Sequence, residues 1–272
     1  MQSLSAASYL TTNSTTMLNK KSFLEKLCKG FIALLFWITV WQITSMLLPD
    51  NLKLFLPSPF AVARRWFEII FEIVYLKATA FTLLRILTGF CLGSAVGIAL
   101  GILTNLSKLS YILLSPALKV VRAVPVVSFI ILAFLFMNND ILPLFISFLM
   151  VVPLVWQATH DSIENADKQL CEMGKVFGFS KLKVLFKIRL PISMPQIVSS
   201  LVSGLGYSWK SGVAAEVICT PAISLGHEIF KGKFNLDYQS VYAVTLTVVF
   251  LSLIIEILFK EISKRYIKGG AV

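Results

Sequence analysis

Apolar residues gather in long runs along this chain, and polar residues are concentrated in the stretches between the runs. A helix that crosses a membrane needs about 20 mostly apolar residues, because the hydrocarbon core is about 30 Å thick and each residue rises about 1.5 Å. The runs that meet this length predict six transmembrane helices, over residues 30–48, 79–103, 115–137, 141–160, 193–218 and 239–260. The predicted fold class is therefore an all-α membrane protein with six spans.

The same pattern divides the chain into a tail of residues 1–29, a transmembrane domain of residues 30–262 and a second tail of residues 263–272. The first tail is rich in Ser and Thr and ends with basic residues, a composition that a signal peptide would also have. The apolar run after it is longer than the apolar part of a signal peptide and lacks a clear cleavage site with small residues. We therefore interpret this run as an uncleaved first span.

Between the first two spans, Pro57-Ser58-Pro59 predicts a rigid extended turn. After this turn, Phe60, Ala63, Phe67 and Ile70 recur at helical spacing. This pattern predicts an amphipathic helix that rests on the outer leaflet.

The second predicted span carries glycine at every fourth position, at Gly89, Gly93, Gly97 and Gly101. A spacing of four places all of them on one stripe of the helix. Lipid gives helices no hydrophobic reason to associate, so small residues that let two backbones approach are a common means of packing in membranes. The stripe therefore predicts close contact with a neighbouring helix rather than a ligand groove.

The third and fourth predicted spans contain Pro116, Pro125, Pro143 and Pro153. Each proline lacks a backbone N–H and restricts the residue before it, so kinks or broken helices are expected. Irregular backbone inside a membrane is tolerated where it is buried in protein or lines a water-filled cavity. These two spans are therefore candidates for the wall of a pathway.

Composition supports a membrane protein, since 57% of the residues are hydrophobic and 14% are charged. The net charge of +11 is also found in nucleic-acid-binding proteins, but here the basic residues lie at the ends of apolar runs instead of on one folded face. Lys and Arg collect in the cytoplasmic loops of membrane proteins. Both termini and the basic loop of residues 161–191 are therefore predicted to be cytoplasmic, in a multi-pass protein of the cytoplasmic membrane with no nucleic-acid partner.

Metal and nucleotide chemistry is not predicted for this chain. The four cysteines are scattered and have no histidine at metal-ligand spacing. Residues 204–211 end in Lys-Ser after a glycine, but Trp209 occupies the second glycine position of a P-loop. His160 and His227 lie at span ends without an evident nucleophile or carboxylate partner, and we interpret them as interfacial residues.

Ionisable residues inside spans are costly and are functional candidates by default. Four residues matter here, namely Arg85, Arg122, Lys210 and Glu216. Arg85 either belongs to a pathway or extends to the outer interface as a snorkelling side chain. Lys210 and Glu216 are six residues apart, which places them about 120° apart around a helix, so they are not neighbours on one face.

Glu216 shares its face with Trp209, whereas Lys210 lines up with Gly206. We hypothesise that Lys210 supplies a positive potential for an anionic or zwitterionic solute. The alternative is that Lys210 pairs with a carboxylate on another helix, such as Glu256. The predicted substrate pathway therefore comprises these residues: Arg122, Pro125, Trp209, Lys210 and Glu216.

The basic loop contains a motif of residues at fixed spacing between Glu172 and Pro191. It contains Glu172-Met173-Gly174, three residues, Gly178, nine residues, Ile188, one residue and Leu190-Pro191. This spacing resembles the EAA loop of ABC transporter permeases, whose pattern is Glu-Ala-Ala, three residues, Gly, nine residues and Ile-x-Leu-Pro. Glu172 is expected near a helix start, where it suits the helix dipole, and Gly178 is expected at a sharp turn. The alternative is a loop whose charges only set orientation.

From about Lys29 onward, the chain is similar to the nitrate, sulfonate and taurine branch of these permeases. The similarity rests on Leu56-Pro57-Ser58-Pro59, on Arg122-Ala123-Val124-Pro125, and on Trp209 followed by Ala214-Ala215-Glu216 and Leu225-Gly226. Two positions depart from the branch pattern, because Ala123 replaces a proline and Ser224 replaces a glycine.

The resemblance implies a type I importer permease fold with a cytoplasmic coupling helix between the fourth and fifth spans. It also implies a pair of permease copies, here a homodimer in membrane lipid, with a cytoplasmic ABC ATPase on each copy and an extracytoplasmic solute-binding protein. ATP and Mg would bind to the ATPase, so this chain is expected to carry no cofactor and to be no enzyme. The motif residues would form the ATPase-coupling site: Glu172, Met173, Gly174, Gly178, Ile188, Leu190 and Pro191.

The expected function is the permease subunit of an ATP-driven importer for a small anionic or zwitterionic solute. The branch suggests nitrate, a sulfonate, taurine, bicarbonate or a pyrimidine vitamin precursor. An ATP-independent secondary carrier is the alternative, and it predicts an internal repeat with broken helices at matching positions. A membrane-embedded enzyme would need facing clusters of His, Asp or Glu, which the sequence does not show.

Overall fold

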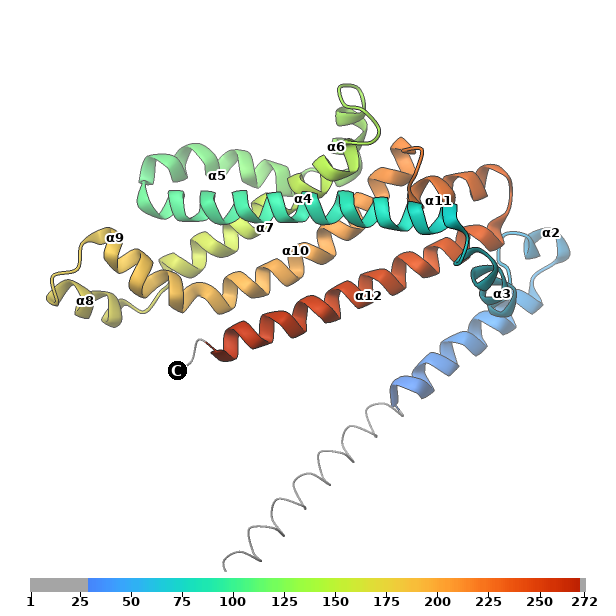
Figure 1. Ribbon diagram of the computed structural model, residues 1–272, viewed down its shortest axis with the longest axis horizontal. Coiled ribbons are helices and arrows are strands. Elements are labelled where there is room, and N and C mark those ends of the chain that lie inside the picture. The colour runs from blue at the N-terminus through green and yellow to red at the C-terminus, as the bar shows by residue number, and fades with distance from the viewer. Residues whose placement is uncertain (1–28, 270–272) are drawn as a thin grey trace, which may run out of the picture. The chain divides into compact units, whose positions relative to one another are not determined.

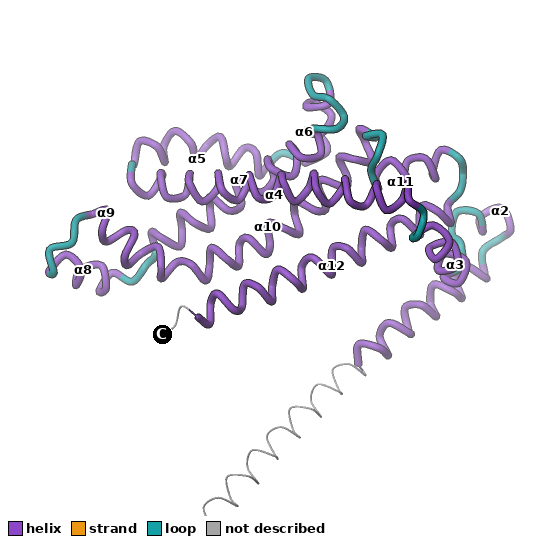
Figure 2. Tube along the Cα trace, viewed as in Figure 1, coloured by secondary structure: helices purple, strands orange, loops and turns teal. Residues whose placement is uncertain are grey.

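The computed structural model describes residues 29–269, and all regular structure within this range is helical (Figures 1 and 2). Residues 1–28, which make up most of the first predicted tail, lie outside the described part of the chain. The helices in chain order are Lys29–Leu47, α2 (Asp50–Lys53), α3 (Pro59–Ile69), α4 (Ile73–Leu106), α5 (Lys108–Ala123), α6 (Val126–Phe134), α7 (Leu142–Glu164), α8 (Lys168–Val176), α9 (Lys181–Val184), the π-helical turn η1 (Leu185–Arg189), α10 (Leu190–Cys219), α11 (Leu225–Phe234) and α12 (Tyr238–Gly269). The chain forms two compact units, one up to Arg64 and one from Arg65 onward.

The first unit contains the helix Lys29–Leu47, which is long and apolar enough to cross a membrane. Its large side chains, such as Trp37, are mostly exposed, as expected where lipid is the solvent. The predicted amphipathic helix is confirmed as α3, which begins at Pro59 after the proline-rich turn. Proline suits a first helical position because its missing N–H would have no partner there.

Within residues 29–269, four helices are long and apolar enough to cross a membrane: Lys29–Leu47, α4, α7 and α12 over Tyr238–Lys264. α5 and α6 together make a fifth candidate, but they are bent by 99° at their junction. The expectation of a kink or break in the third predicted span, residues 115–137, is therefore confirmed. The break coincides with Pro125, which precedes α6 and restricts Val124 to extended backbone.

The other prolines do not break their helices. Pro143 lies in the first turn of α7, where it costs no hydrogen bond, and Pro116 and Pro153 lie inside α5 and α7, which continue past them. α10 covers the predicted span 193–218 and, with 30 residues, is about 45 Å long. It is not among the apolar candidates because it contains six serines besides Lys210 and Glu216.

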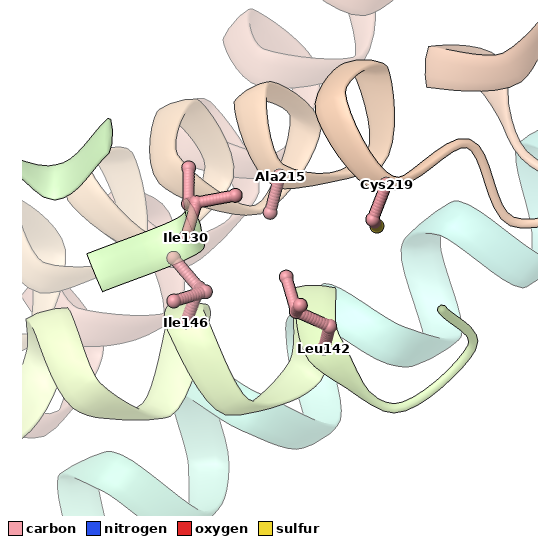
Figure 3. Close-up of a cluster of buried hydrophobic side chains, with 5 residues drawn as sticks. All are labelled: Ile130, Leu142, Ile146, Ala215 and Cys219. Carbon is pink, nitrogen blue, oxygen red and sulfur yellow. The ribbon is translucent and has the colours of Figure 1, made fainter. Parts of the chain in front are cut away.

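In the second unit, α7 packs along α4 on one side and along α10 on another. Figure 3 shows one buried cluster in this core, in which Ile130 of α6, Leu142 and Ile146 of α7, and Ala215 and Cys219 of α10 point toward one another. The cluster joins the broken segment to the two long helices. The bend after α5 is thus held by apolar contacts with α7 and α10.

The glycine stripe of α4 lies against α7. A Cβ atom at Gly89 would be 2.4 Å from the Leu144 carbonyl oxygen, and one at Gly93 would be 2.8 Å from that of Phe148. At Gly101 the nearest atom is Thr159 Cβ, at 2.5 Å. Because no side chain fits in these gaps, the two backbones approach as closely as only glycine permits.

Candidate functional site

The motif loop lies between α7 and α10 and contains α8, α9 and η1. Figure 1 places α8 and α9 at one end of the second unit and α11 at the opposite end. α8 begins at Lys168, and the Asp167 carboxylate caps it by accepting a bond of 2.8 Å from the Gln169 N–H. The expectation that Glu172 lies near the helix start is wrong, because α8 begins one turn earlier and Asp167 provides the negative charge there.

Gly178 ends α8 in a left-handed conformation, with φ of +75°. Its N–H donates to the Lys175 carbonyl at 2.9 Å, and the Phe179 N–H donates to the Gly174 carbonyl at 3.0 Å. These two bonds form a Schellman motif, which requires left-handed backbone at the residue after the C-cap. Glycine adopts this conformation without the steric cost that a Cβ atom brings.

Gly174 brings α8 against η1. A Cβ atom added at Gly174 would lie 2.5 Å from Ile188 Cδ1, so the isoleucine of the motif packs directly onto this glycine. Arg189 adds a second link, because its Nε donates to Cys171 Sγ at 3.4 Å. The spacing of the motif thus corresponds to a short helix, α8, that folds back onto η1. The π-helical turn η1 leads directly into α10, whose first two residues are Leu190 and Pro191.

The outer face of α8 is apolar at its tip. Met173, Val176 and Phe177 are 50%, 87% and 72% exposed, and Glu172 is exposed beside them. A short helix with such a tip outside the apolar spans offers a contact surface for a partner. The sequence interpretation missed Val176 and Phe177, although two large apolar residues beside the motif glycine in a charged loop were a usable signal.

Lys210 is exposed on α10 and lines a groove of about 590 Å³ between α10 and α12. The groove is also lined by the hydroxyl groups of Ser203 and Tyr207. Glu256 lies in the same groove, but its carboxylate is 2.5 Å from Lys260 Nζ. Within the described residues Lys210 forms no ion pair, so the alternative of a Lys210–Glu256 pair is not found in this structure.

Arg122 and Pro125 are exposed where α5 ends. Arg122 lines a second hollow of about 240 Å³ together with Gln157 and Ser203. Ser203 of α10 therefore borders both hollows, one of which is lined by Lys210 of α10 and the other by Arg122 of α5. The structure thus brings Arg122 and Lys210 to adjoining hollows.

Trp209 and Glu216 lie apart from this polar face, inside the second unit. The Trp209 indole N–H donates to the Val248 carbonyl at 3.2 Å. Glu216 is fully buried and accepts bonds from Thr82 Oγ1 at 2.8 Å and from the Gly226 N–H at 3.3 Å. Lys210 and Glu216 therefore lie on different faces of α10, as predicted: Lys210 lines an exposed groove, whereas Glu216 is buried.

Arg85 faces the second oxygen of Glu216 at 3.5 Å and is itself only 12% exposed. It also donates to Asp140 Oδ1 at 2.6 Å and to the Ile223 carbonyl at 2.8 Å. Arg85 therefore joins α4, the loop before α7, α10 and the loop before α11, instead of extending freely to the outer interface. The sequence interpretation missed Asp140 and Thr82, because nothing local in the sequence links them to Glu216.

The first turn of α11 forms hydrogen bonds with Thr82 and with the buried Glu216. The Leu225 N–H donates to Thr82 Oγ1 at 3.0 Å, beside the Gly226 bond to Glu216. A Cβ atom at Gly226 would lie 2.5 Å from the Glu216 backbone carbon, so only glycine permits this approach. Ser224, at the position where the branch pattern has glycine, caps α11 through a bond of 3.0 Å from the His227 N–H to its hydroxyl.

Comparison with known proteins extends these observations. A probable ABC transporter permease of Brucella melitensis is 26% identical over 77% of this chain and 85% of its own length. The nitrate import permease of a Synechocystis species is 29% identical over 74% of this chain and 76% of its own length. The putative aliphatic sulfonates transport permease of Bacillus subtilis is 26% identical over 79% of this chain and 78% of its own length.

Solved structures show the same fold. A chain of an amino acid ABC transporter, solved with histidines, matches over 71% of this chain and 92% of its own length, with a TM-score of 0.59 and 13% identity. A chain of the MetNI methionine ABC transporter, in an inward-facing conformation, covers 83% and 100%, with a TM-score of 0.55 and 15% identity. The family model for the inner membrane component of binding-protein-dependent transport systems matches residues 93–268, more than half of the chain. The chain therefore belongs to this family of ABC transporter permeases.

Proposed function

We propose that this chain is the permease subunit of an ATP-driven importer and couples to a separate ABC ATPase through α8. The observation that carries this proposal is the fold of the motif loop. Gly178 and the Gly174–Ile188 contact hold α8 firmly against the entrance of α10, while its apolar tip stays exposed. A force on α8 would therefore be transmitted to α10 through packed side chains.

On this proposal, ATP and Mg bind to the ATPase, and the permease itself carries out no catalysis. Two copies of the chain pair in the membrane, and an extracytoplasmic binding protein delivers the solute. α10 acts as a sixth span in addition to the four apolar helices and the bent pair α5–α6. The exposed Ser199, Ser203 and Lys210 line the groove beside α12 and suit a helix that faces a water-filled pathway, because polar residues in membranes face a cavity or a protein interior.

Both termini and the α8 loop are proposed to be cytoplasmic. The support is the concentration of Lys and Arg in these segments, which sets orientation in multi-pass proteins. α11 would then lie on the extracytoplasmic side, since it occupies the end of the second unit opposite α8.

The proposed solute is a small anion or zwitterion. Arg122 and Lys210 place positive charge on the two hollows that meet at Ser203. Two relatives carry names that refer to nitrate and to aliphatic sulfonates, both of which are anions. A cationic pathway raises the local concentration of such a solute.

The importer proposal is tested by co-purification and transport. Expressed with its genomic neighbours and purified in detergent, the permease is expected to retain an ABC ATPase. Reconstituted with that ATPase and the binding protein, it should import solute only when ATP is supplied on the α8 side. Solute accumulation by the permease alone, driven by an ion gradient, would instead establish the secondary carrier.

Lys210→Met is expected to raise the KM for the anionic solute about tenfold, whereas Lys210→Arg should stay close to wild type. The reason is that a charge near a pathway acts over several ångströms and survives a change of shape but not neutralisation. Solute uptake as a function of concentration measures the effect. Equal, normal uptake by both variants would remove the charge of Lys210 from the mechanism.

A further inference from the structure

A third hollow, which is also basic, lies at the motif loop and plays no part in the pathway described above. It has a volume of about 250 Å³ and is bordered by the end of α4, at Leu106, and by residues of α8, α9 and η1. Lys175, Lys181 and Arg189 supply its charged lining. We call this hollow the basic pocket.

The basic pocket has an excess of positive charge. No Asp or Glu lines it, and within the described residues none of its three cations forms an ion pair. Arg189 uses its Nε to contact Cys171, which leaves its two terminal nitrogens free of bonds to other described residues. Three unneutralised cations that converge on one hollow favour an anionic occupant.

The position of the pocket at the end of a span indicates the source of that anion. Leu106 is the last residue of α4, so the pocket lies where an apolar span ends. Its remaining wall includes Phe179, Val184 and Leu185, which are apolar. A site that combines cations with apolar groups at the end of a span matches the boundary between lipid headgroups and acyl chains.

We propose that the basic pocket binds the phosphate of an anionic phospholipid in the cytoplasmic leaflet. Arg189 suits this role because its planar guanidinium can hold two phosphate oxygens, and the two lysines add point charges. The bound phosphate links the end of α4 to the segment that follows α8, so it stabilises the coupling loop against the membrane. The inference rests on the cytoplasmic orientation proposed for this loop, but not on the identity of the solute.

The test is a titration of the detergent-solubilised complex of permease and ATPase with a short-chain phosphatidylglycerol. Lys181→Gln and Arg189→Gln are each expected to weaken binding about fivefold, the effect of one basic residue at an anionic lipid surface. Lys187→Gln is the matched control, because Lys187 is exposed on η1 in the same loop but does not line the pocket. Its affinity should equal that of the wild type.

Two further titrations identify the ligand. Short-chain phosphatidylcholine, which has a phosphate but no net charge, is expected to bind at least tenfold more weakly than phosphatidylglycerol. Inorganic phosphate at millimolar concentration should leave phosphatidylglycerol bound. Displacement by inorganic phosphate would assign the pocket to a soluble anion, and equal binding by all variants would overturn the proposal. Because lipid affinity is measured without transport, this result is independent of whether the complex imports solute.

Discussion

Gly178→Val is expected to reduce ATP-dependent uptake about tenfold while the protein still inserts and pairs with its ATPase. Gly178 has a φ of +75° and no other atom within 4 Å of a Cβ position, so the effect arises from the backbone alone. A side chain in left-handed backbone costs about 1–2 kcal/mol. This cost corresponds to roughly a tenfold fall in the population of molecules in which the C-terminal end of α8 is capped. Uptake and solute-stimulated ATP hydrolysis in proteoliposomes measure the change.

Gly178→Asn is the matched control, because asparagine enters the left-handed region more readily than other residues with a side chain. It should retain most of the uptake that Gly178→Val loses. Normal coupling in the valine variant would show that the loop contributes only its charges, which was the alternative interpretation of this segment.

Glu216→Leu is expected to lower the free energy of unfolding by about 1–3 kcal/mol, because Arg85, which is 12% exposed, then keeps only the largely exposed carboxylate of Asp140 as its charged partner. The same change removes the acceptor for Thr82 and for the Gly226 N–H at the start of α11. Thermal unfolding of the detergent-solubilised complex measures the loss. The double variant Arg85→Met with Glu216→Leu should recover part of it, since the guanidinium that has lost its buried partner is then removed as well.

Glu216→Gln separates a packing role from a role in the pathway. Glutamine keeps an oxygen that can accept from Thr82 and Gly226 but removes the charge. If Glu216 positions α11, this variant should be less stable than the wild type but more stable than Glu216→Leu. A loss of uptake with unchanged thermal stability would instead return Glu216 to the pathway, where the sequence interpretation put it. Unchanged stability of Glu216→Leu would exclude the positioning role.

Several features of this permease follow from its sequence because their causes are local. The length of apolar runs located the helices around Lys29–Leu47, α4, α7 and α12. The helical spacing of apolar residues after the proline-rich turn predicted α3, and the six-residue offset predicted that Lys210 and Glu216 do not share a face. The motif spacing indicated the family that the comparisons then established.

Other features required the tertiary structure because they depend on residues far apart in the chain. The prolines predicted a break in the third span but not its angle of 99°, because contacts of α6 with α7 and α10 hold the bend. Apolarity alone did not reveal that Arg85 would meet Asp140 and Glu216, which are 55 and 131 residues away. Side chains of this kind find their partners only when helices pack.

The motif loop shows both kinds of information in one place. The positions of its glycine and proline follow from local rules, because a left-handed turn requires glycine and the first turn of α10 tolerates Pro191. That Gly174 receives the Ile188 side chain, and that Val176 and Phe177 remain uncovered, was decided by how α8 folds back onto η1. Backbone conformation is a property of neighbouring residues, whereas burial is a property of the packed chain.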